Sequence, residues 1–290
     1  MSPRNAPVIL PDQSGRTWLV TGATNGVGRE VAREAAAAGA RVLITSRDEE
    51  RGTDTAAEIG AAGVVAVDFA SQAAVREAAD QVSESIDVLV DNAGAVTHSR
   101  QESEDGHELM LATNFLGPFA LTNLIADRVR GRIVIVGSDA HRGARVDLED
   151  PHFRTRRWSI GAAYGQSKLA DMLWALDLDR RLRALDRDVS VQLAHPGWAL
   201  TNLQNATPDP RLNRAITAVC SAFAQPAAVA ARSLLIAATA DLPPVSYVGP
   251  GGTGGLRGEP ALAGRSVPAS NPHLARQVWD LGVRETGTDL

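Results

Sequence analysis

A glycine-rich turn between an apolar strand and a helix constrains the fold of this 290-residue chain more than any other feature. Residues 16–21 predict a buried strand, and residues 21–28 follow with the spacing G-x-x-x-G-x-G. A helical segment then ends at Gly39, and residues 41–45 predict a second strand. Glycines let the backbone approach a phosphate closely, and a helix N-terminus supplies unpaired N–H groups. This unit is therefore a candidate dinucleotide site.

Strand-like and helical segments continue to alternate beyond this unit. The predicted helices cover residues 48–59, 72–82, 108–129, 162–185 and 226–239, and the predicted strands cover 64–67, 86–90, 132–136, 190–193 and 245–248. Such alternation is typical of a parallel sheet with helices on both faces. We therefore predict a single α/β domain over residues 1–290, a Rossmann fold with a doubly wound, seven-stranded parallel sheet.

Three details of this fold can also be predicted. Residues 1–15 would form an N-terminal extension, and residues 249–290 a C-terminal tail. The glycine-rich residues 249–258 would form a turn after the last strand. Within the long helix over 108–129, Gly117 and Pro118 predict a kink.

Composition and charge argue against several classes of protein. The net charge is −5 with both signs interspersed, so no nucleic-acid-binding face is predicted. Cys220 is the only cysteine, which excludes an internal disulfide and a cysteine-rich metal site and fits a reducing compartment. The six histidines lack H-x-x-x-H spacing, so no metal is predicted.

Hydropathy bears on the location of the protein. The first 14 residues are polar and hold three prolines, so no signal peptide is predicted. The longest apolar stretch, residues 215–240, is interrupted by Gln225, Pro226 and Arg232, which argues against a membrane span. We expect a cytoplasmic protein, and the strong use of alanine and arginine is typical of a GC-rich bacterial gene.

Polar clusters follow the predicted strands at their carboxyl ends. They are the glycine turn, Ser46-Arg47, Asp68, residues 92–94, Ser138 and residues 196–201. Ligands of open α/β sheets bind outside the carboxyl ends of the strands. These clusters are therefore expected to form one site.

Tyr164 and Lys168 single out the helix over residues 162–185. Lys168 is the only lysine in the chain, and Tyr164 is one of two tyrosines. Residues four apart on a helix share a face, and a nearby cation favours the phenolate form of a tyrosine. The pair is thus suited to proton transfer near neutral pH. Read alone, the spacing also fits a coincidental surface pair.

Taken in order, these motifs resemble the short-chain dehydrogenase/reductase family of the classical type over roughly residues 16–248. Residues 21–28 match T-G-x-x-x-G-x-G, residues 92–94 match N-A-G and residues 196–197 match P-G. The family's catalytic tetrad is matched by Asn114, Ser138, Tyr164 and Lys168.

Further detail resembles the retinol-dehydrogenase and protochlorophyllide-reductase-like branch of that family. The matching segments are residues 113–117, 164–170, 195–198 with Thr201, and 247–250. The sequence departs from the pattern at Asp91, where the family often has a second Asn, and at Phe115, where the branch often has His. We expect the Asp91 departure to leave catalysis intact.

The resemblance implies an oxidoreductase that transfers a hydride between a nicotinamide and a hydroxyl or carbonyl carbon. Tyr164 would be the acid/base, and Lys168 would assist it and hold the nicotinamide ribose. Ser138 would bind the substrate oxygen and stabilise developing charge. Asn114 would anchor a relay water beside Lys168. Arginine does not deprotonate readily, which explains why a chain that otherwise uses arginine has a lysine here.

The resemblance also implies where the cofactor binds. Enzymes that prefer NAD place Asp or Glu about 20 residues after the glycine motif. Ser46 and Arg47 stand there instead and suit a 2′-phosphate, so NADP(H) is favoured over NAD(H), although Arg47 also fits a surface position at a helix start. The predicted cofactor-binding residues are Gly22, Thr24, Asn25, Gly26, Val27, Gly28, Ser46, Arg47, Asp68 and Phe69 (beside adenine), Asn92, Ala93 and Gly94 (beside the adenine ribose), Tyr164, Lys168, Pro196, Gly197, Trp198, and Thr201 (at the carboxamide).

The sequence does not decide the substrate, the direction of its conversion or the oligomeric state. A homo-oligomer is compatible with it. Residues 198–225 are apolar and fit either a lid over a hydrophobic small molecule or an ordinary helix pair. Arg154, Arg156 and Arg157 fit either a solvated face or a site for an acidic group.

Three other functions fit parts of the sequence. A C=C bond reductase of the same family and a non-catalytic NADP(H) sensor are the alternatives, but a sensor has no need of the tetrad. A hydrolase triad of Ser138, His141 and Asp147 is disfavoured because the G-x-S-x-G motif is absent.

Overall fold

All strands of the described residues belong to one sheet. The computed structural model describes residues 10–197 and 225–290. Its strands are β1 (Thr17–Val20), β2 (Arg41–Ser46), β3 (Gly63–Ala66), β4 (Ile86–Asp91), β5 (Val129–Val136), β6 (Ser190–Ala194), β7 (Tyr247–Pro250) and β8 (Pro260–Leu262). They lie in the order β3-β2-β1-β4-β5-β6-β7-β8, and only β7 and β8 pair antiparallel. The central position of β1, with the chain winding first one way and then the other, is that of a doubly wound sheet.

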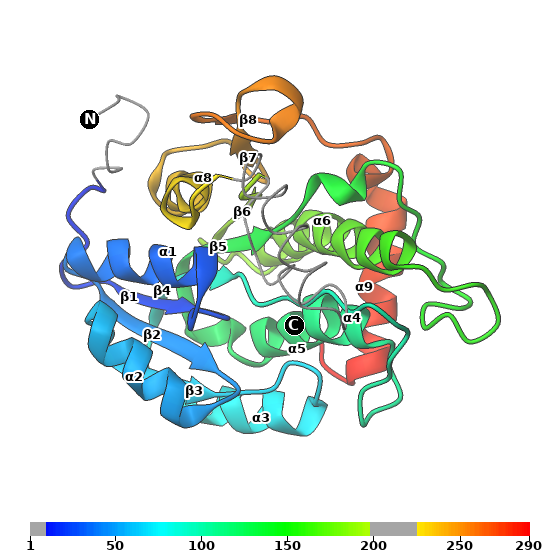
Figure 1. Ribbon diagram of the computed structural model, residues 1–290, viewed down its shortest axis with the longest axis horizontal. Helices are drawn as coiled ribbons and strands as arrows, with labels where there is room; N and C mark the ends of the chain where they lie inside the picture. The colour runs from blue at the N-terminus through cyan, green and yellow to red at the C-terminus, as the bar shows by residue number, and fades with distance from the viewer. Residues whose placement is uncertain (1–9, 198–224) are drawn as a thin grey trace, which may run out of the picture.

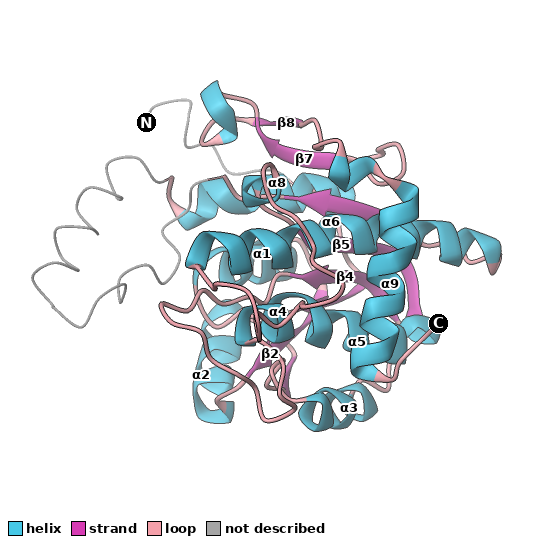
Figure 2. Ribbon diagram, turned by 90° about the vertical axis from the view of Figure 1, so that its right-hand side faces the viewer, coloured by secondary structure: helices cyan, strands magenta, loops and turns pink. Residues whose placement is uncertain are grey.

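Helices cover both faces of this sheet (Figures 1 and 2). The main ones are α1 (Gly26–Ala37), α2 (Glu49–Ile59), α3 (Gln72–Gln81), α5 (Gly117–Leu124), α6 (Ile160–Ala184), α8 (Ala227–Thr239) and α9 (Pro272–Thr286). One buried apolar cluster joins the sheet to α1, α2 and α8, and a second joins its other face to α3, α5, α6 and α9. The predicted Rossmann fold is confirmed.

Local caps fix the helix ends close to their predicted places. Asp48, Ser71 and Ser159 are N-caps, and each side chain accepts a hydrogen bond from an N–H three residues on. Gly60 ends α2 in the left-handed conformation, with φ +75°. Across the described residues, no helix combines the length and the apolar character needed to cross a membrane.

The C-terminal region differs from the prediction in two ways. The sheet has eight strands instead of seven, because β8 pairs with β7 after the glycine-rich turn. The predicted tail also contains α9, which begins with Asn271 as N-cap and Pro272, and ends at Gly287 with φ +65°. Both cap signals are present in the sequence. Gly282 lets α9 approach α5, since a Cβ there would lie 2.8 Å from the Phe119 ring.

The predicted helix over residues 108–129 is shorter and contains a π-helical turn. α4 (Leu109–Leu111) leads into η2 (Ala112–Leu116), α5 ends at Leu124, and β5 already begins at Val129. Pro118 has no N–H for the carbonyl of Asn114, and the Gly117 N–H donates instead to the carbonyl of Ala112, five residues back. The glycine–proline pair thus produces a π bulge, and this bulge carries Asn114.

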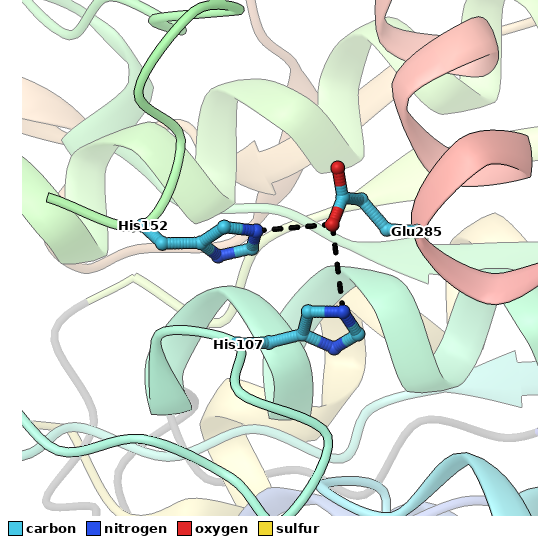
Figure 3. A group of neighbouring side chains, drawn as sticks. All are labelled: His107, His152 and Glu285. Atoms are coloured by element: carbon cyan, nitrogen blue, oxygen red, sulfur yellow. Dashed lines mark hydrogen bonds and ion pairs between the residues drawn. The ribbon is translucent and has the colours of Figure 1, made fainter. Parts of the chain in front are cut away.

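Glu285 on α9 ties this helix to two loops from the middle of the chain (Figure 3). Its Oε2 lies 3.1 Å from Nε2 of His152 and 3.5 Å from Nε2 of His107. Both histidines are buried, and their rings stack with centroids 5.1 Å apart. Hydrogen bonds from His107 and His152 hold the pKa of Glu285 well below its usual range. The tie fixes α9 against segments that border the carboxyl-end edge of the sheet.

The same three side chains are of the kinds that bind metals, and their ligand atoms lie within 4.8 Å of one another. Their spacing in the sequence does not predict such a group. However, the Glu108 N–H donates to Nδ1 of His152 at 3.1 Å. The neutral ring then carries its proton on Nε2, the atom that faces Glu285, so this atom has no lone pair for a metal. We interpret the group as a hydrogen-bonded tie.

Replacing Glu285 by Gln should lower the free energy of unfolding at pH 7 by about 1–3 kcal/mol, because hydrogen bonds to a charged group are weakened. The folded-state pKa of Glu285 is depressed, so its contribution is complete above the unfolded pKa of about 4.3 and is lost as the pH falls through the folded value. The deficit of the variant should therefore shrink in acid.

Denaturant unfolding at pH 7 and in a series of buffers below pH 4 measures this difference. Asp280→Asn, which changes an exposed carboxylate on the same helix, is the control. A deficit that stays constant with pH, or that is matched by Asp280→Asn, would contradict the role of Glu285.

Candidate active site

The sheet brings the predicted polar clusters to one edge. Seven of its strands are parallel, so the segments that follow them all leave the sheet at the same end. The glycine turn follows β1, residues 92–94 follow β4, Ser138 follows β5 and Pro196 follows β6.

Thr21 joins the ends of β1 and β4. Its hydroxyl accepts hydrogen bonds from the N–H groups of Asn92 and Ala93, both at 2.9 Å, and donates to the carbonyl of Val90 at 3.2 Å. The Asn92 amide donates back to the carbonyls of Thr21 and Gly22, at 2.9 and 3.2 Å. The glycine turn and the Asn-Ala-Gly segment are therefore one hydrogen-bonded unit.

Three glycines shape the turn for different reasons. Gly22 has φ +63°, and a Cβ there would lie 2.8 Å from Cα of Ala93. A Cβ at Gly28 would lie 2.3 Å from Nδ2 of Asn92. Gly26 has φ +57°, but no described atom lies within 4 Å of the place its Cβ would take. The space over Gly26 is therefore open.

This open space lies at the start of α1, whose N-terminus lacks a side-chain cap. Asn25 is the N-cap, is exposed and makes no side-chain capping bond, and Thr24 beside it is half-buried. The first N–H groups of a helix favour an anion. Val27, the second residue of α1, is buried, so its side chain is not open to a ligand. The turn thus fits the diphosphate of a dinucleotide, held by the main chain at residues 24–26.

The end of β2 presents an exposed guanidinium and a buried hydroxyl. Arg47 is exposed. Ser46 is buried, and its hydroxyl donates to the carbonyl of Asp48 at 2.5 Å while accepting from the Asp48 N–H at 3.2 Å. Of these two predicted cofactor residues, Arg47 is therefore the one whose side chain is open to a ligand.

Asp68 and Phe69 follow β3 but differ in what they expose. Asp68 is half-buried, and its Oδ1 accepts a hydrogen bond from the Ala70 N–H at 2.9 Å. The Phe69 ring lies in the core, and the Phe69 carbonyl lies 2.3 Å from where a Cβ of Gly117 would be. Any contact of Phe69 with an adenine would therefore come from its main chain.

Helix α6 carries Tyr164 and approaches Ser138 closely. A Cβ at Gly165 would lie 3.1 Å from the carbonyl oxygen of Ala140, so the small residue lets α6 pack on the 3-10 turn η4 (Asp139–His141). Ser138 caps η4, with its Oγ accepting from the Ala140 N–H at 3.2 Å. Tyr164 itself is half-buried against an apolar cluster of Met110, Phe153, Trp158 and Ala163.

Lys168 is buried, with 6% of its surface exposed. Its Nζ donates to the carbonyl of Val136, the last residue of β5, at 2.8 Å and to Oδ2 of Asp171 at 2.9 Å. Burial alone would lower the pKa of Lys168, but the charges of Asp171 and Tyr164 raise it above its ordinary value. The ammonium is therefore charged and fixed on the helix that carries Tyr164.

Asn114 lies at the same place. Its Oδ1 accepts from the Ala95 N–H at 2.7 Å, and its Nδ2 donates to the Ala95 carbonyl at 3.1 Å and to Oγ of Ser167 at 2.9 Å. A Cβ at Gly94 would lie 3.3 Å from Oδ1 of Asn114 and 4.0 Å from Nζ of Lys168. The structure thus brings Asn114 and Lys168 together beside the exposed Gly94.

Two carboxyl groups behind Lys168 were not predicted as part of the site. Asp171 is the partner of the ammonium, and Asp91 is buried nearby, with its Oδ2 accepting from the Thr122 hydroxyl at 3.0 Å. The i,i+3 spacing of Lys168 and Asp171 on a helix was the available signal. Nothing local reveals the burial of Asp91.

The arginine cluster holds the connection between η4 and α6. Arg156 donates to Oε1 of Gln166 at 2.5 Å and lies over the Phe153 ring, and Arg154 donates to the carbonyl of Gly106 at 3.1 Å. Arg157 is exposed. Two of the three arginines therefore have structural partners within this connection and its neighbours.

His141 cannot serve Ser138 as a base in this arrangement. Its Nδ1 lies 2.6 Å from the Ser138 carbonyl oxygen, to which it must donate, and its Nε2 accepts from the Ser266 N–H at 3.2 Å. Both ring nitrogens are thus engaged away from the Ser138 hydroxyl. This agrees with the rejection of a hydrolase triad.

Pro196 and Gly197 close the site on the β6 side. Gly197 has φ +69°, and a Cβ there would lie 2.6 Å from the carbonyl oxygen of Leu256. Trp198, Thr201 and the predicted lid up to residue 224 lie outside the described residues.

Comparison with known proteins decides the family. A protein-family sequence model described as "short chain dehydrogenase" matches residues 16–211. The chain belongs to the short-chain dehydrogenase family. The predicted family is therefore confirmed.

Two relatives of this short-chain dehydrogenase are named as dehydrogenases and match about two thirds of the chain. Polyprenol dehydrogenase of Mus musculus is 41% identical over 214 residues, which cover 68% of this chain and 64% of that protein. Retinol dehydrogenase 13 of Homo sapiens is 35% identical over 206 residues, covering 67% and 62%. The chain thus matches under two thirds of the length of these two relatives. They support the predicted retinol-dehydrogenase-like branch.

Two other matches cover nearly the whole chain, and a third covers less of it. A Streptomyces sp. (strain C5) protein named "Putative daunorubicin C-13 ketoreductase DnrU" is 33% identical over 282 residues, covering 94% of this chain and 93% of that protein. A solved structure of an uncharacterised Mycobacterium paratuberculosis protein is 38% identical with a TM-score of 0.84, covering 97% of each chain. Pseudomonas aeruginosa RhlG, solved as an NADP active-site complex, is 26% identical with a TM-score of 0.60, covering 78% of this chain and 91% of that one.

Gly28→Ala should weaken dinucleotide binding by about tenfold or more, which corresponds to 1.4 kcal/mol. The added Cβ would collide with Nδ2 of Asn92 and with the carbonyl oxygen of Gly22, so the turn must shift. Isothermal titration with NADPH measures the affinity. Gly161→Ala, at a helical position of α6 with no atom within 4 Å, is the control and should bind as the native chain does. Equal affinities of the two variants would contradict the role of the turn.

Proposed function

We propose that this protein transfers a hydride between NADP(H) and the hydroxyl or carbonyl carbon of a hydrophobic small molecule. The observation that carries this proposal is the buried, charged ammonium of Lys168 on the helix that carries Tyr164, at the sheet edge where an open glycine turn fits a diphosphate.

Each residue of the tetrad has a separate task in this proposal. When bound, the cofactor supplies or accepts the hydride. Tyr164 gives a proton to the substrate oxygen during reduction and takes it back during oxidation. Lys168 favours the phenolate by its charge, and Ser138, at the end of β5, donates a hydrogen bond to the same oxygen.

Asn114 has a positioning task. Its three hydrogen bonds to Ala95 and Ser167 fix the π-helical turn beside Lys168 and Gly94. The segment that would line the ribose is thereby held against α6. We propose that Asn114 keeps the ammonium and the ribose in register.

The preference for NADP(H) rests on Arg47. This guanidinium is exposed at the end of β2, where the second ribose of a dinucleotide bound along the glycine turn would lie. A phosphate accepts two parallel hydrogen bonds from a guanidinium, which a hydroxyl group cannot match. The similarity to RhlG, which was solved with NADP, supports this choice.

The substrate class is argued from the surroundings of Tyr164 and from the relatives. Met110, Phe153 and Trp158 belong to the apolar cluster against which Tyr164 packs, so the surroundings of this side chain are apolar. Two relatives are named as dehydrogenases of polyprenol and of retinol, which are apolar alcohols. A third relative is named as a ketoreductase. We propose an apolar alcohol, aldehyde or ketone as the substrate.

Tyr164→Phe should abolish turnover and leave NADPH affinity within about twofold, because only the proton-transferring hydroxyl is removed. A screen of apolar alcohols, aldehydes and ketones with NADP+ and NADPH supplies the assay. Tyr247→Phe, which changes the other tyrosine of the chain, is the control and should keep its rate. Retained turnover in Tyr164→Phe would overturn the acid/base assignment.

Arg47→Ala should weaken binding of NADPH by about tenfold or more while leaving NADH binding nearly unchanged, since a charge-assisted hydrogen bond contributes about 1.5–3 kcal/mol. Arg51→Ala removes another exposed arginine, one turn into α2, and serves as the control. Tighter binding of NADH than NADPH by the native chain would refute the NADP(H) preference.

A further inference from the structure

The interior behind Lys168 contains two carboxyl groups. Asp171 follows Lys168 by three residues on α6, and its Oδ2 lies 2.9 Å from the ammonium. Asp91 is the last residue of β4, beside Ile135 of β5, and its Oδ2 accepts from the Thr122 hydroxyl on α5. Asp171 is 1% exposed and Asp91 is 5% exposed. Both carboxyls are thus in a dry environment.

Each of these carboxyls has one buried oxygen without a hydrogen-bond partner among the described residues, Oδ1 in both cases. An unpaired carboxylate oxygen is costly in such surroundings. The two carboxyls lie beside the same end of β5, because Asp91 pairs with Ile135 and the carbonyl of the next residue, Val136, accepts from the ammonium that binds Asp171.

One cation faces this pair within the described residues. It is Lys168, which contacts Asp171. α5 contributes the uncharged Thr122, and the neighbouring strands contribute apolar side chains on the same face of the sheet, such as Leu19 of β1 and Ile135 of β5. Two carboxylates and one ammonium would carry a net charge of −1 in this interior. One proton on the pair makes the cluster neutral and gives an unpaired oxygen a hydrogen to donate.

We propose that Asp91 and Asp171 form a buried carboxyl pair that shares one proton and holds Lys168 in position for Tyr164. Both aspartates are positioning residues, because they act through Lys168. The existence of the pair stands on the structure alone, whereas its effect on turnover rests on the proposed function.

The pKa values of the two carboxyls support the presence of one proton on the pair. Burial raises the pKa of Asp91 to about 8, with the Thr122 hydroxyl opposing and the charge of Asp171 adding to the rise. Burial raises the pKa of Asp171 to about 6, while the Lys168 ammonium opposes that rise. At neutral pH Asp91 therefore keeps the proton and Asp171 pairs with Lys168.

Loss of this proton in alkali would change the site. Once Asp91 ionises, the pair carries one more negative charge. This charge partly cancels the positive potential of the Lys168 ammonium at the Tyr164 phenol, so the phenolate becomes less favoured. Alcohol oxidation, which needs the phenolate, should be slowed above the titration of Asp91.

Infrared spectroscopy of the full chain without cofactor tests the shared proton directly. The native protein should show a protonated-carboxyl band at pH 7 that disappears with a midpoint near pH 8, and Asp91→Asn should lack it. Asp177→Asn is the control, because this buried carboxylate of the same helix is ionised by its bonds to Arg180 and Arg181. Absence of the band in the native protein, or its persistence in Asp91→Asn, would overturn the proposal.

Thr122→Val provides a second, nearly isosteric variant. It removes the hydroxyl that favours the ionised form of Asp91, so the midpoint of the infrared titration should move to higher pH. An unchanged or lower midpoint would overturn the assignment of the band, even if Asp91→Asn failed to fold.

The pH profile of kcat/KM for alcohol oxidation tests the action through Lys168. Asp91→Asn mimics the protonated group, so it should match the native rate at pH 7 and exceed it several-fold above pH 9. Superimposable profiles would show a merely structural role. If no alcohol is oxidised at all, the proposed function fails, while the infrared titration still decides whether the carboxyl pair shares a proton.

Discussion

A buried ammonium is the interaction on which the site depends. Lys168 is the only lysine of the chain, and the fold places it almost out of contact with water. A charge in such a place must be compensated, and here the carbonyl of Val136 and the carboxylate of Asp171 do so. Because these two partners come from β5 and from α6 itself, the ammonium also fixes how α6 meets the sheet. Tyr164 and Ser138 lie on the two sides of that junction.

The other parts of the site follow from backbone constraints around this junction. Pro118 removes an N–H from a helix, and the resulting π-helical turn carries Asn114 to Ala95 and Lys168. Gly165 lets α6 approach η4, and Thr21 joins the glycine turn to the end of β4. Small residues and one proline thus position the polar groups, and the apolar cores on the two faces of the sheet hold them there.

Much of this could be predicted from sequence where the signal is local. Alternating apolar segments predicted the parallel sheet, and the glycine spacing predicted a turn at the start of α1. The break near Pro118 was predicted as a kink, but its π-helical form depends on which carbonyl the Gly117 N–H reaches. Contacts between residues far apart in the sequence could not be predicted in this way. Glu285 reaches His107 and His152 only once α9 has packed, and Asp91 lies near Asp171 only once α6 has packed on the sheet. The cap residues of α9 were readable and were missed.

The destination of the hydride tests the central claim most directly. NADPH deuterated on the transferring face of nicotinamide C4 would be incubated with the protein and an apolar ketone or aldehyde from the substrate panel, and the product examined by mass spectrometry and NMR. We predict one deuterium on the carbon that bears the new hydroxyl group. Deuterium on a carbon away from the oxygen, as in reduction of a C=C bond, or an unlabelled alcohol product, would contradict hydride transfer to a carbonyl carbon beside Tyr164.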